Sequence, residues 1–281
     1  MGGEIIMEER ELIHTEELAE ILQVLMHRYG YDFTGYAKAS LLRRVNRFAK
    51  ETDNKSFYDL KYTLLNNEAV FQHFLQEVTV NVTELFRDPL YYKILREKVL
   101  PVLASYPIIK IWHAGCSSGE EVYSMCILLH EAGLLQRARI YATDINPANL
   151  EKAKNGILSL RNMKEYTTNY HQSGGKCDFA DYYTARYDHV FIKEELRRQV
   201  IFSQHNLVSD NAFNEFQFIA CRNVMIYFNK ELQDRALQLF YDSLSPLGFL
   251  TLGLKESLQF SVVKEKFDTL HTTAKIFRRK D

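Results

Sequence analysis

Apolar residues recur at intervals of three and four positions through residues 1–78, a spacing that predicts amphipathic helices. Thr15 can cap the first of these helices, and Gly30 can end it. A later helix is expected to begin at Ser56, with Asp59 placed for a capping box. The pattern therefore predicts an all-helical domain over residues 1–85, whose apolar stripes include Leu18, Ile21, Leu22 and Leu25; Leu41, Leu42, Val45 and Phe48; and Val70, Phe71, Phe74, Leu75 and Val78.

Residues 78–87 interrupt this period with β-branched residues and mark the hinge to a second domain, residues 86–281. Asp88 and Pro89 read as the N-cap and the first residue of the next helix. After them, short apolar segments alternate with helical ones, the order typical of an α/β domain. Strands are expected at residues 108–112, 142–144, 200–202, 216–221 and 249–254, with a closing hairpin within residues 267–279.

Residues 160–195 differ from the alternating pattern around them. They are rich in Tyr, His, Asp and Gly, and Gly174 and Gly175 stand between polar runs. His189 to Ile192 reads as a short strand. We interpret this stretch as a small antiparallel β-subdomain inserted in the α/β domain.

The stretch from Ile108 to Ser124 reads as a strand, a tight turn between Gly115 and Gly119, and a helix that opens at Glu120. A dinucleotide site needs a third glycine and tolerates no acid beside the pyrophosphate, whereas here Glu121 adds a second carboxylate. The two acids suit a ligand with a positive group, such as the ammonium of S-adenosylmethionine.

Asp144 ends the next strand, 25 residues after Gly119, where an acid can bind ribose hydroxyls. An ordinary strand–helix turn with an acid at the helix start explains any one of these features equally well. Together they favour a site for a methyl donor.

The helix around residues 38–50 carries a row of cations: Arg43, Arg44, Arg47 and Lys50, with Lys38 just before. They recur at spacings of three and four, so they share one face, and no acid occurs between Phe33 and Lys50. Such runs are most often solvated helix faces. An acidic partner is the alternative interpretation.

Composition limits the remaining possibilities. The chain has 281 residues and a net charge of −1, which disfavours a general nucleic-acid binder. Its four cysteines include no Cys-x-x-Cys pair, so neither a zinc site nor a disulfide framework is expected. No apolar run approaches a membrane span, and the acidic start is not a signal peptide. We expect a cytoplasmic protein.

Taken together, the motifs resemble the CheR family, the chemotaxis-receptor glutamate methyltransferases. The resemblance covers nearly the whole chain and rests on NVTELFRD at residues 81–88, GCSSGEE at 115–121, ATDI at 142–145, Asn206-Leu207 and CRNVMIYF at 221–228. The chain departs from the family pattern at Leu85, at Val122 and within residues 253–257, positions that we expect to lie away from the donor pocket.

The resemblance implies a Rossmann-like S-adenosylmethionine methyltransferase domain, with the helical domain before it and the β-subdomain inserted in it. It implies transfer of a methyl group to glutamate carboxylates of a chemotaxis receptor, whose acidic helical bundle would face the basic helix. Arg87 and Tyr227 would lie near the transferred methyl. The donor contacts would be Asn81, Thr83, Arg87, Ala114, Gly115, Glu120, Asp144, Ile145, Asn206, Leu207 and Asn223.

The chemistry of such a transfer asks little of the protein beyond alignment. A glutamate carboxylate is already ionised at neutral pH, so no general base is expected. The nine histidines are scattered without metal-ligand spacing, so no metal is expected, and we expect a monomer. Two alternatives remain open from the residues alone. One is a methyltransferase acting on another protein or a small molecule, and the other is a signalling module that binds the donor without catalysis.

Overall fold

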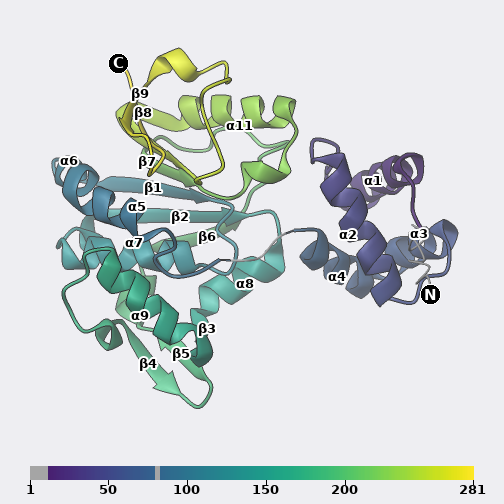
Figure 1. Ribbon diagram of the computed structural model, residues 1–281, viewed down its shortest axis with the longest axis horizontal. Helices are drawn as coiled ribbons and strands as arrows, with labels where there is room; N and C mark the ends of the chain where they lie inside the picture. Colours follow the sequence, from purple (N-terminus) through teal and green to yellow (C-terminus); the bar gives the residue numbers. More distant parts are fainter. Residues whose placement is uncertain (1–11, 80–82) are drawn as a thin grey trace, which may run out of the picture. The chain divides into compact units, whose positions relative to one another are not determined.

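The computed structural model describes residues 12–79 and 83–281. The chain forms two compact units, Met1–Val80 and Asn81–Asp281. An all-helical unit followed by a Rossmann-like α/β unit with a small antiparallel sheet confirms the predicted fold class (Figure 1).

Within residues 12–79 the first unit forms four helices: α1 (Thr15–Tyr29), α2 (Lys38–Glu51), α3 (Phe57–Asn66) and α4 (Glu68–Val78). Gly30 ends α1 in the left-handed conformation, and the Ser56 hydroxyl caps α3 by accepting from the Asp59 amide at 3.1 Å. Thr15 is already helical, so the expectation that it caps α1 is wrong. His14 occupies the cap position, where its amide donates to Glu17 at 2.8 Å.

The second unit is built on a seven-stranded sheet in the order β6-β2-β1-β7-β8-β10-β9, counted over its described residues. The strands from β6 to β8 are parallel, and β10 runs antiparallel to both of its neighbours. Their bounds are β1 Ile109–Ala114, β2 Ala138–Asp144, β6 Val200–Gln204, β7 Phe216–Cys221, β8 Leu244–Leu252, β9 Phe267–His271 and β10 Ile276–Arg279.

Apolar side chains pack on both faces of the sheet, since neighbouring residues of β1 point in opposite directions. Ile111 belongs to a large apolar cluster with residues of the helices α5 (Pro89–Ile94), α6 (Leu100–Leu103) and α7 (Glu120–Glu131). Trp112 faces the other way, where its ring lies 5.4 Å from that of Phe240 in α11 (Lys230–Ser243). Between α5 and α6 the chain forms a π-helical turn, η1 (Leu95–Val99).

Strand β8 begins earlier than the sequence predicts, at Leu244 rather than Phe249. Phe216 pairs with Leu244, whereas Phe218 pairs with Phe249, so the register shifts across residues 245–248. This bulge accommodates Pro246, which cannot donate to a regular ladder.

The inserted subdomain contains a three-stranded antiparallel sheet in the order β3-β5-β4, with β3 at Ile157–Ser159, β4 at Tyr183–Arg186 and β5 at His189–Ile192. It also contains a helix that the polar composition did not indicate, α9 (Met163–Gln172). Met163, Tyr166 and Tyr170 form its buried stripe. Shorter elements complete the unit: α8 (Pro147–Asn155), α10 (Glu194–Arg197) and the 3-10 turns η2 (Leu135–Arg137), η3 (Leu160–Asn162), η4 (Phe179–Tyr182), η5 (Met225–Tyr227) and η6 (Lys264–Lys266).

Candidate active site

The predicted site residues of the second unit gather where four parallel strands end. The strand order reverses between β1 and β7, and ligands of open α/β sheets bind at the carboxyl ends of the strands beside such a reversal. The loop from Gly115 follows β1, Asp144 ends β2, and Asn206 and Asn223 follow β6 and β7. Sequence position therefore places these four segments at one edge of the sheet.

The glycine turn directs its backbone amides inward. The amides of Gly115 and Cys116 both donate to the Thr143 carbonyl at 2.8 Å, and the Ser117 amide donates to the Asp144 carboxylate at 2.8 Å. These amides cannot cradle a pyrophosphate at the same time. The geometry agrees with the prediction that the turn does not serve a dinucleotide.

Gly115 also brings two loops into direct contact. It adopts a φ of 77°, and a Cβ atom on it would lie 2.4 Å from Cγ2 of Val224, in the loop after β7. Only glycine allows this approach.

Glu120 is the first residue of α7 and is only 8% exposed. Its carboxylate accepts a hydrogen bond from the Ser118 hydroxyl at 2.7 Å and forms no ion pair within the described residues. Burial raises the pKa of Glu120 above its usual value, although the Ser118 hydrogen bond lowers it. A buried carboxylate of this kind favours a cationic ligand, which would compensate its charge.

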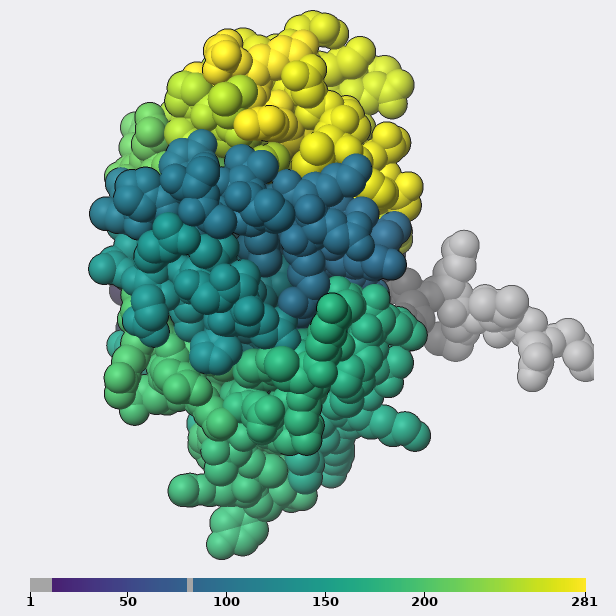
Figure 2. Space-filling model, turned by 90° about the vertical axis from the view of Figure 1, so that its left-hand side faces the viewer, coloured from purple at the N-terminus to yellow at the C-terminus, as the bar shows by residue number. Residues whose placement is uncertain are grey.

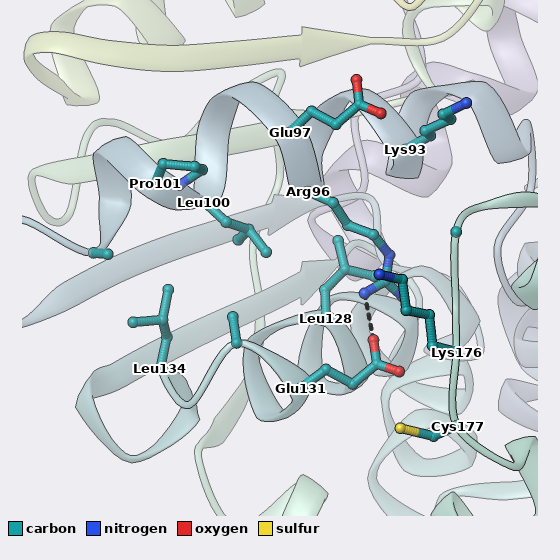
Figure 3. A pocket seen from close by; sticks show the side chains of 13 residues that line it. Lys93, Arg96, Glu97, Leu100, Pro101, Leu128, Glu131, Leu134, Lys176 and Cys177 are labelled. Atoms are coloured by element: carbon teal, nitrogen blue, oxygen red, sulfur yellow. Dashed lines mark ion pairs between the residues drawn. The ribbon is translucent and has the colours of Figure 1, made fainter.

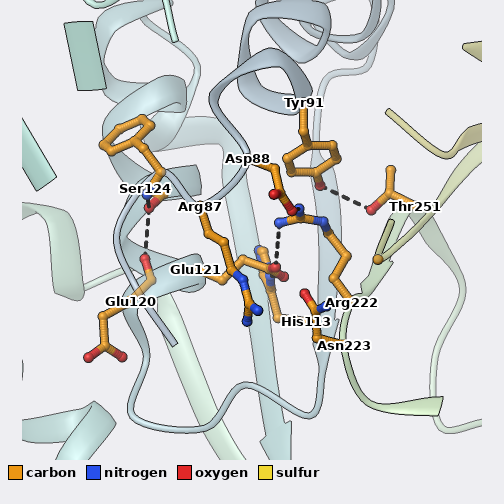
Figure 4. A network of polar contacts seen from close by, with 12 residues as sticks. Arg87, Asp88, Tyr91, His113, Glu120, Glu121, Ser124, Arg222, Asn223 and Thr251 are labelled. Carbon is orange, nitrogen blue, oxygen red and sulfur yellow. Dashed lines mark hydrogen bonds and ion pairs between the residues drawn. The ribbon is translucent and has the colours of Figure 1, made fainter. Parts of the chain in front are cut away.

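Glu121 has a different role from the one expected of the two acids. It accepts from Arg222 Nη1 at 3.0 Å and contacts His113 Nδ1 at 2.9 Å, and Arg222 Nη2 lies 2.6 Å from Asp88 (Figure 4). Burial alone would raise the pKa of Glu121, but the His113 hydrogen bond and the Arg222 charge lower it. This carboxylate belongs to an internal network and is not available to a ligand.

The network also explains why Asp88 does not cap the helix that follows it. Asp88 occupies the N-cap position of α5, but its φ is 59° and its side chain makes no cap hydrogen bond. Phe86 is also left-handed, with a φ of 54°, and its amide donates to the Ser124 hydroxyl at 2.9 Å. Arg87 lies between these two left-handed residues. The hydrogen bond of Phe86 and the ion pair of Asp88 stabilise their backbone conformations.

Arg87 itself remains accessible, with its side chain 34% exposed. Its Nε atom lies 4.0 Å from Glu84, a weak pairing. Figure 4 shows its guanidinium between the start of α7 and Asn223.

Asp144 accepts more hydrogen bonds from the protein than the sequence indicates. Besides the Ser117 amide, it accepts from the Asn146 amide at 2.9 Å and from the Asn149 side chain at 3.3 Å. Burial raises the pKa of Asp144, and these hydrogen bonds oppose the shift. The carboxylate therefore organises the loops after β1 and β2 in addition to any contact with a ribose.

The other predicted donor residues occupy varied positions. The Asn206 side chain accepts from the Val208 amide at 2.9 Å and so shapes its own loop, beside the buried Leu207. Thr83, Ile145 and Tyr227 are half-buried, and Tyr227 ends the η5 turn. Ala114 is the buried last residue of β1, and Asn81 lies outside the described residues.

Sequence reasoning missed Glu256, which holds the loop after β7. Its buried carboxylate accepts from the amides of Gly253, Asn223, Val224 and Met225 at 2.5, 3.0, 2.9 and 2.7 Å. A Cβ on Gly253 would lie 2.7 Å from the Asn223 nitrogen. Residues 253–257 therefore contact Asn223, which the resemblance assigns to the donor. The only signal in the sequence was an acid shortly after an apolar strand.

The cations of α2 are partly compensated, contrary to the sequence reading. Arg47 pairs with Glu77 at 2.7 Å and with Glu51 at 3.5 Å, and Arg44 donates to the Val78 carbonyl at 3.0 Å. Glu77 belongs to α4, 30 positions away, so the local sequence could not reveal it. Arg43 is exposed and forms no ion pair within the described part of the chain.

Over residues 12–79 and 83–281, no group of three or more His, Cys, Asp or Glu side chains is arranged to hold a metal ion. No helix in these residues combines the length and the apolar character needed to cross a membrane.

Comparison with known proteins matches both units to family models. Residues 81–276 match the CheR methyltransferase SAM-binding domain, and residues 16–79 match the CheR methyltransferase all-alpha domain. A Pseudomonas putida protein, whose name gives it provisionally as methyltransferase Cher3, is 47% identical over 94% of this chain and 96% of its own length.

Two relatives are named chemotaxis protein methyltransferase. The one from Listeria innocua is 31% identical over 84% of this chain and 88% of its own length. The one from Salmonella typhimurium is 30% identical over 92% of this chain and 89% of its own length.

The burial of Glu120 predicts pH-dependent donor binding. Affinity for S-adenosylhomocysteine should fall as the pH decreases through the raised pKa of Glu120, because the protonated carboxyl no longer attracts the ligand ammonium. Glu120→Gln should bind about 10- to 100-fold more weakly near neutral pH, the loss of one charge-assisted hydrogen bond. Calorimetry over a pH series measures both effects. An affinity and pH profile like those of the unchanged protein would remove Glu120 from the donor site.

The four amides on Glu256 predict a joint effect on stability and donor binding. Glu256→Ala should lower the free energy of unfolding by about 2–4 kcal/mol, because buried amides lose their acceptor. Glu256→Gln, which keeps one acceptor oxygen, should have a free energy of unfolding between those of Glu256→Ala and the unchanged protein. Urea unfolding and S-adenosylhomocysteine titration check this. Glu265→Ala, at a carboxylate 87% exposed, is the matched control and should change neither quantity.

Proposed function

This chain belongs to the CheR methyltransferase family, and we propose that it transfers the methyl group of S-adenosylmethionine to glutamate side chains in the cytoplasmic domain of a chemotaxis receptor. The observation that carries the proposal is the buried Glu120 carboxylate, without an ion-pair partner in the described residues, at the switch point of a matched SAM-binding domain. The names of the Listeria and Salmonella relatives support the chemotaxis role.

The residues present fit the donor. Glu120 would pair with its ammonium group, and Asp144 would use its remaining lone pairs for the ribose hydroxyls. The backbone amides of the glycine turn are already hydrogen-bonded within the protein, so they do not require a phosphate group on the ligand. When bound, S-adenosylmethionine supplies a methyl group made electrophilic by its positively charged sulfur.

The acceptor needs orientation and no deprotonation. A glutamate side chain with a reference pKa of ~4.3 is ionised at neutral pH, so its oxygen is already nucleophilic. Arg87 carries a planar donor fork and is accessible, so it would align the carboxylate with one or two hydrogen bonds. A tighter clamp would stabilise the ground state and slow transfer, because catalysis requires stronger contacts in the transition state.

The Arg222 network would keep Arg87 in place. Arg222 fixes Asp88, the next residue in the chain, to the start of α7 through Glu121. We regard Asp88 and Arg222 as positioning residues, because neither side chain is available to touch substrate. Tyr227, at the end of η5, remains our second candidate near the transferred methyl.

The basic face of α2, defined as Arg43, Arg44, Arg47 and Lys50, would guide an acidic receptor bundle. Since Arg44 and Arg47 already have partners within the first unit, Arg43 is the strongest candidate for the encounter. Exposed charge pairs contribute mainly to encounter rate and register.

The central prediction concerns product and Arg87 together. The chain should transfer labelled methyl groups from S-adenosylmethionine to a receptor cytoplasmic fragment, and mild base should release the label, because glutamyl methyl esters hydrolyse readily. Arg87→Ala should reduce kcat about 100-fold, the effect of losing one positioned charge-stabilising donor, and should lose far less affinity for S-adenosylhomocysteine.

Other outcomes would point elsewhere. A base-stable product, or label on another molecule, would indicate a different acceptor. Intact donor binding without any transfer would indicate a non-catalytic module. Equal losses of donor affinity and turnover in Arg87→Ala would make Arg87 a donor-site residue only. Arg87→Lys serves as a control, since it keeps the charge without the fork.

Charge reversal on the basic face should affect the receptor and spare the donor. Arg43→Glu should raise the receptor KM by about five- to tenfold at low salt, and the difference should shrink as salt screens the charges. Steady-state assays at several receptor concentrations measure it. Lys55→Glu is the matched control, because Lys55 is exposed outside α2 and carries the same charge. Equal KM values for both variants would indicate that this face is only a solvated surface.

A further inference from the structure

A cavity of about 760 Å³ lies in the second unit, bounded by the segment Lys93–Ala104, the end of α7 and the loop of residues 174–177. In Figure 2 these three segments share one face, in blue, teal and green. The volume is typical of small-molecule sites, which occupy about 300–1,000 Å³. None of the residues predicted for the methyl donor lines it.

The lining of the cavity holds three cations, Lys93, Arg96 and Lys176, and two acids, Glu97 and Glu131, and so carries a net positive charge. Arg96 Nη1 pairs with Glu131, and the hydroxyls of Tyr170 and Tyr182 also donate to that carboxylate. Glu131 Oε1 accepts both hydroxyls, whereas Glu131 Oε2 meets only the charge of Arg96, and Arg96 Nη2 is buried without a hydrogen-bond partner. Figure 3 shows the Lys176 side chain pointing toward the Arg96 guanidinium. Two cations directed at one place favour an anion between them.

The opposite wall is apolar. Leu100, Pro101, Leu128 and Leu134 line it, so a ligand can bury a hydrocarbon part there while its charged end lies against Arg96 (Figure 3). Arg96 belongs to the π-helical turn η1, and such turns occur frequently at functional sites.

We propose that this cavity is a binding site for a small amphipathic carboxylate, held by Arg96 and Lys176 at its charged end and by the leucine wall along its chain. The site is separate from the methyl-donor site. Glu120 begins α7 and Glu131 ends it, and a helix of this length spans about 17 Å. The cavity therefore accepts its ligand while the donor site is full.

Calorimetry with hexanoate as the probe tests the proposal on the full chain saturated with S-adenosylhomocysteine. Hexanoate should bind saturably at one site per chain. Hexanamide, of equal length but uncharged, should bind at least about tenfold more weakly, because a charge-assisted contact is lost. Inorganic phosphate should also bind more weakly than hexanoate, because it leaves the leucine wall uncovered.

Two variants locate the binding. Lys176→Ala should weaken hexanoate binding by about fivefold or more, since it removes one of the two cations. Ala132→Trp should abolish binding by filling the cavity without changing its charge. Lys98→Ala, in the same π-helical turn as Arg96 but outside the cavity lining, should bind hexanoate normally. Failure of hexanoate to bind saturably, or binding that both cavity variants leave intact, would overturn the proposal.

Discussion

The geometry of the candidate active site depends on the ion pairs of the buried Arg222 guanidinium. Its side chain is only 1% exposed, and it joins Asp88 before α5 to Glu121 at the start of α7 while lying 3.9 Å from the ring centre of Tyr91. Three segments that are distant in the sequence thus meet at one charge. A buried ion carries a large desolvation cost, so removing one partner of such a network typically destabilises a protein by about 3–5 kcal/mol.

Close backbone contacts also hold these loops together. Gly115 lets the loop after β1 touch Val224, and Gly253 lets the loop after β8 approach Asn223. Glu256 then binds the intervening amides. Loops that are tied to one another in this way can hold a reactive geometry within the small tolerance that in-line transfer requires.

Three buried carboxylates of this edge differ in how far the protein satisfies them. Glu256 accepts four backbone amides, and Asp144 accepts two amides and one side-chain amide. Among residues 12–79 and 83–281, the Glu120 carboxylate accepts only the Ser118 hydroxyl, apart from its own backbone amide. Since a buried charge is costly unless it is compensated, this difference supports the proposal that Glu120 pairs with a cationic ligand.

The sequence by itself determined the helical unit, the segments that form the parallel strands and the motif loops. These follow from periodicity, helix caps and glycine turns, which are local properties. It did not reveal α9, whose buried face consists of Met and Tyr among polar residues. It also could not assign Glu121 to Arg222, Arg47 to Glu77 or Glu256 to Asn223. Which of several acids remains open to a ligand depends on partners 30 to 101 positions away, and only folding brings those together.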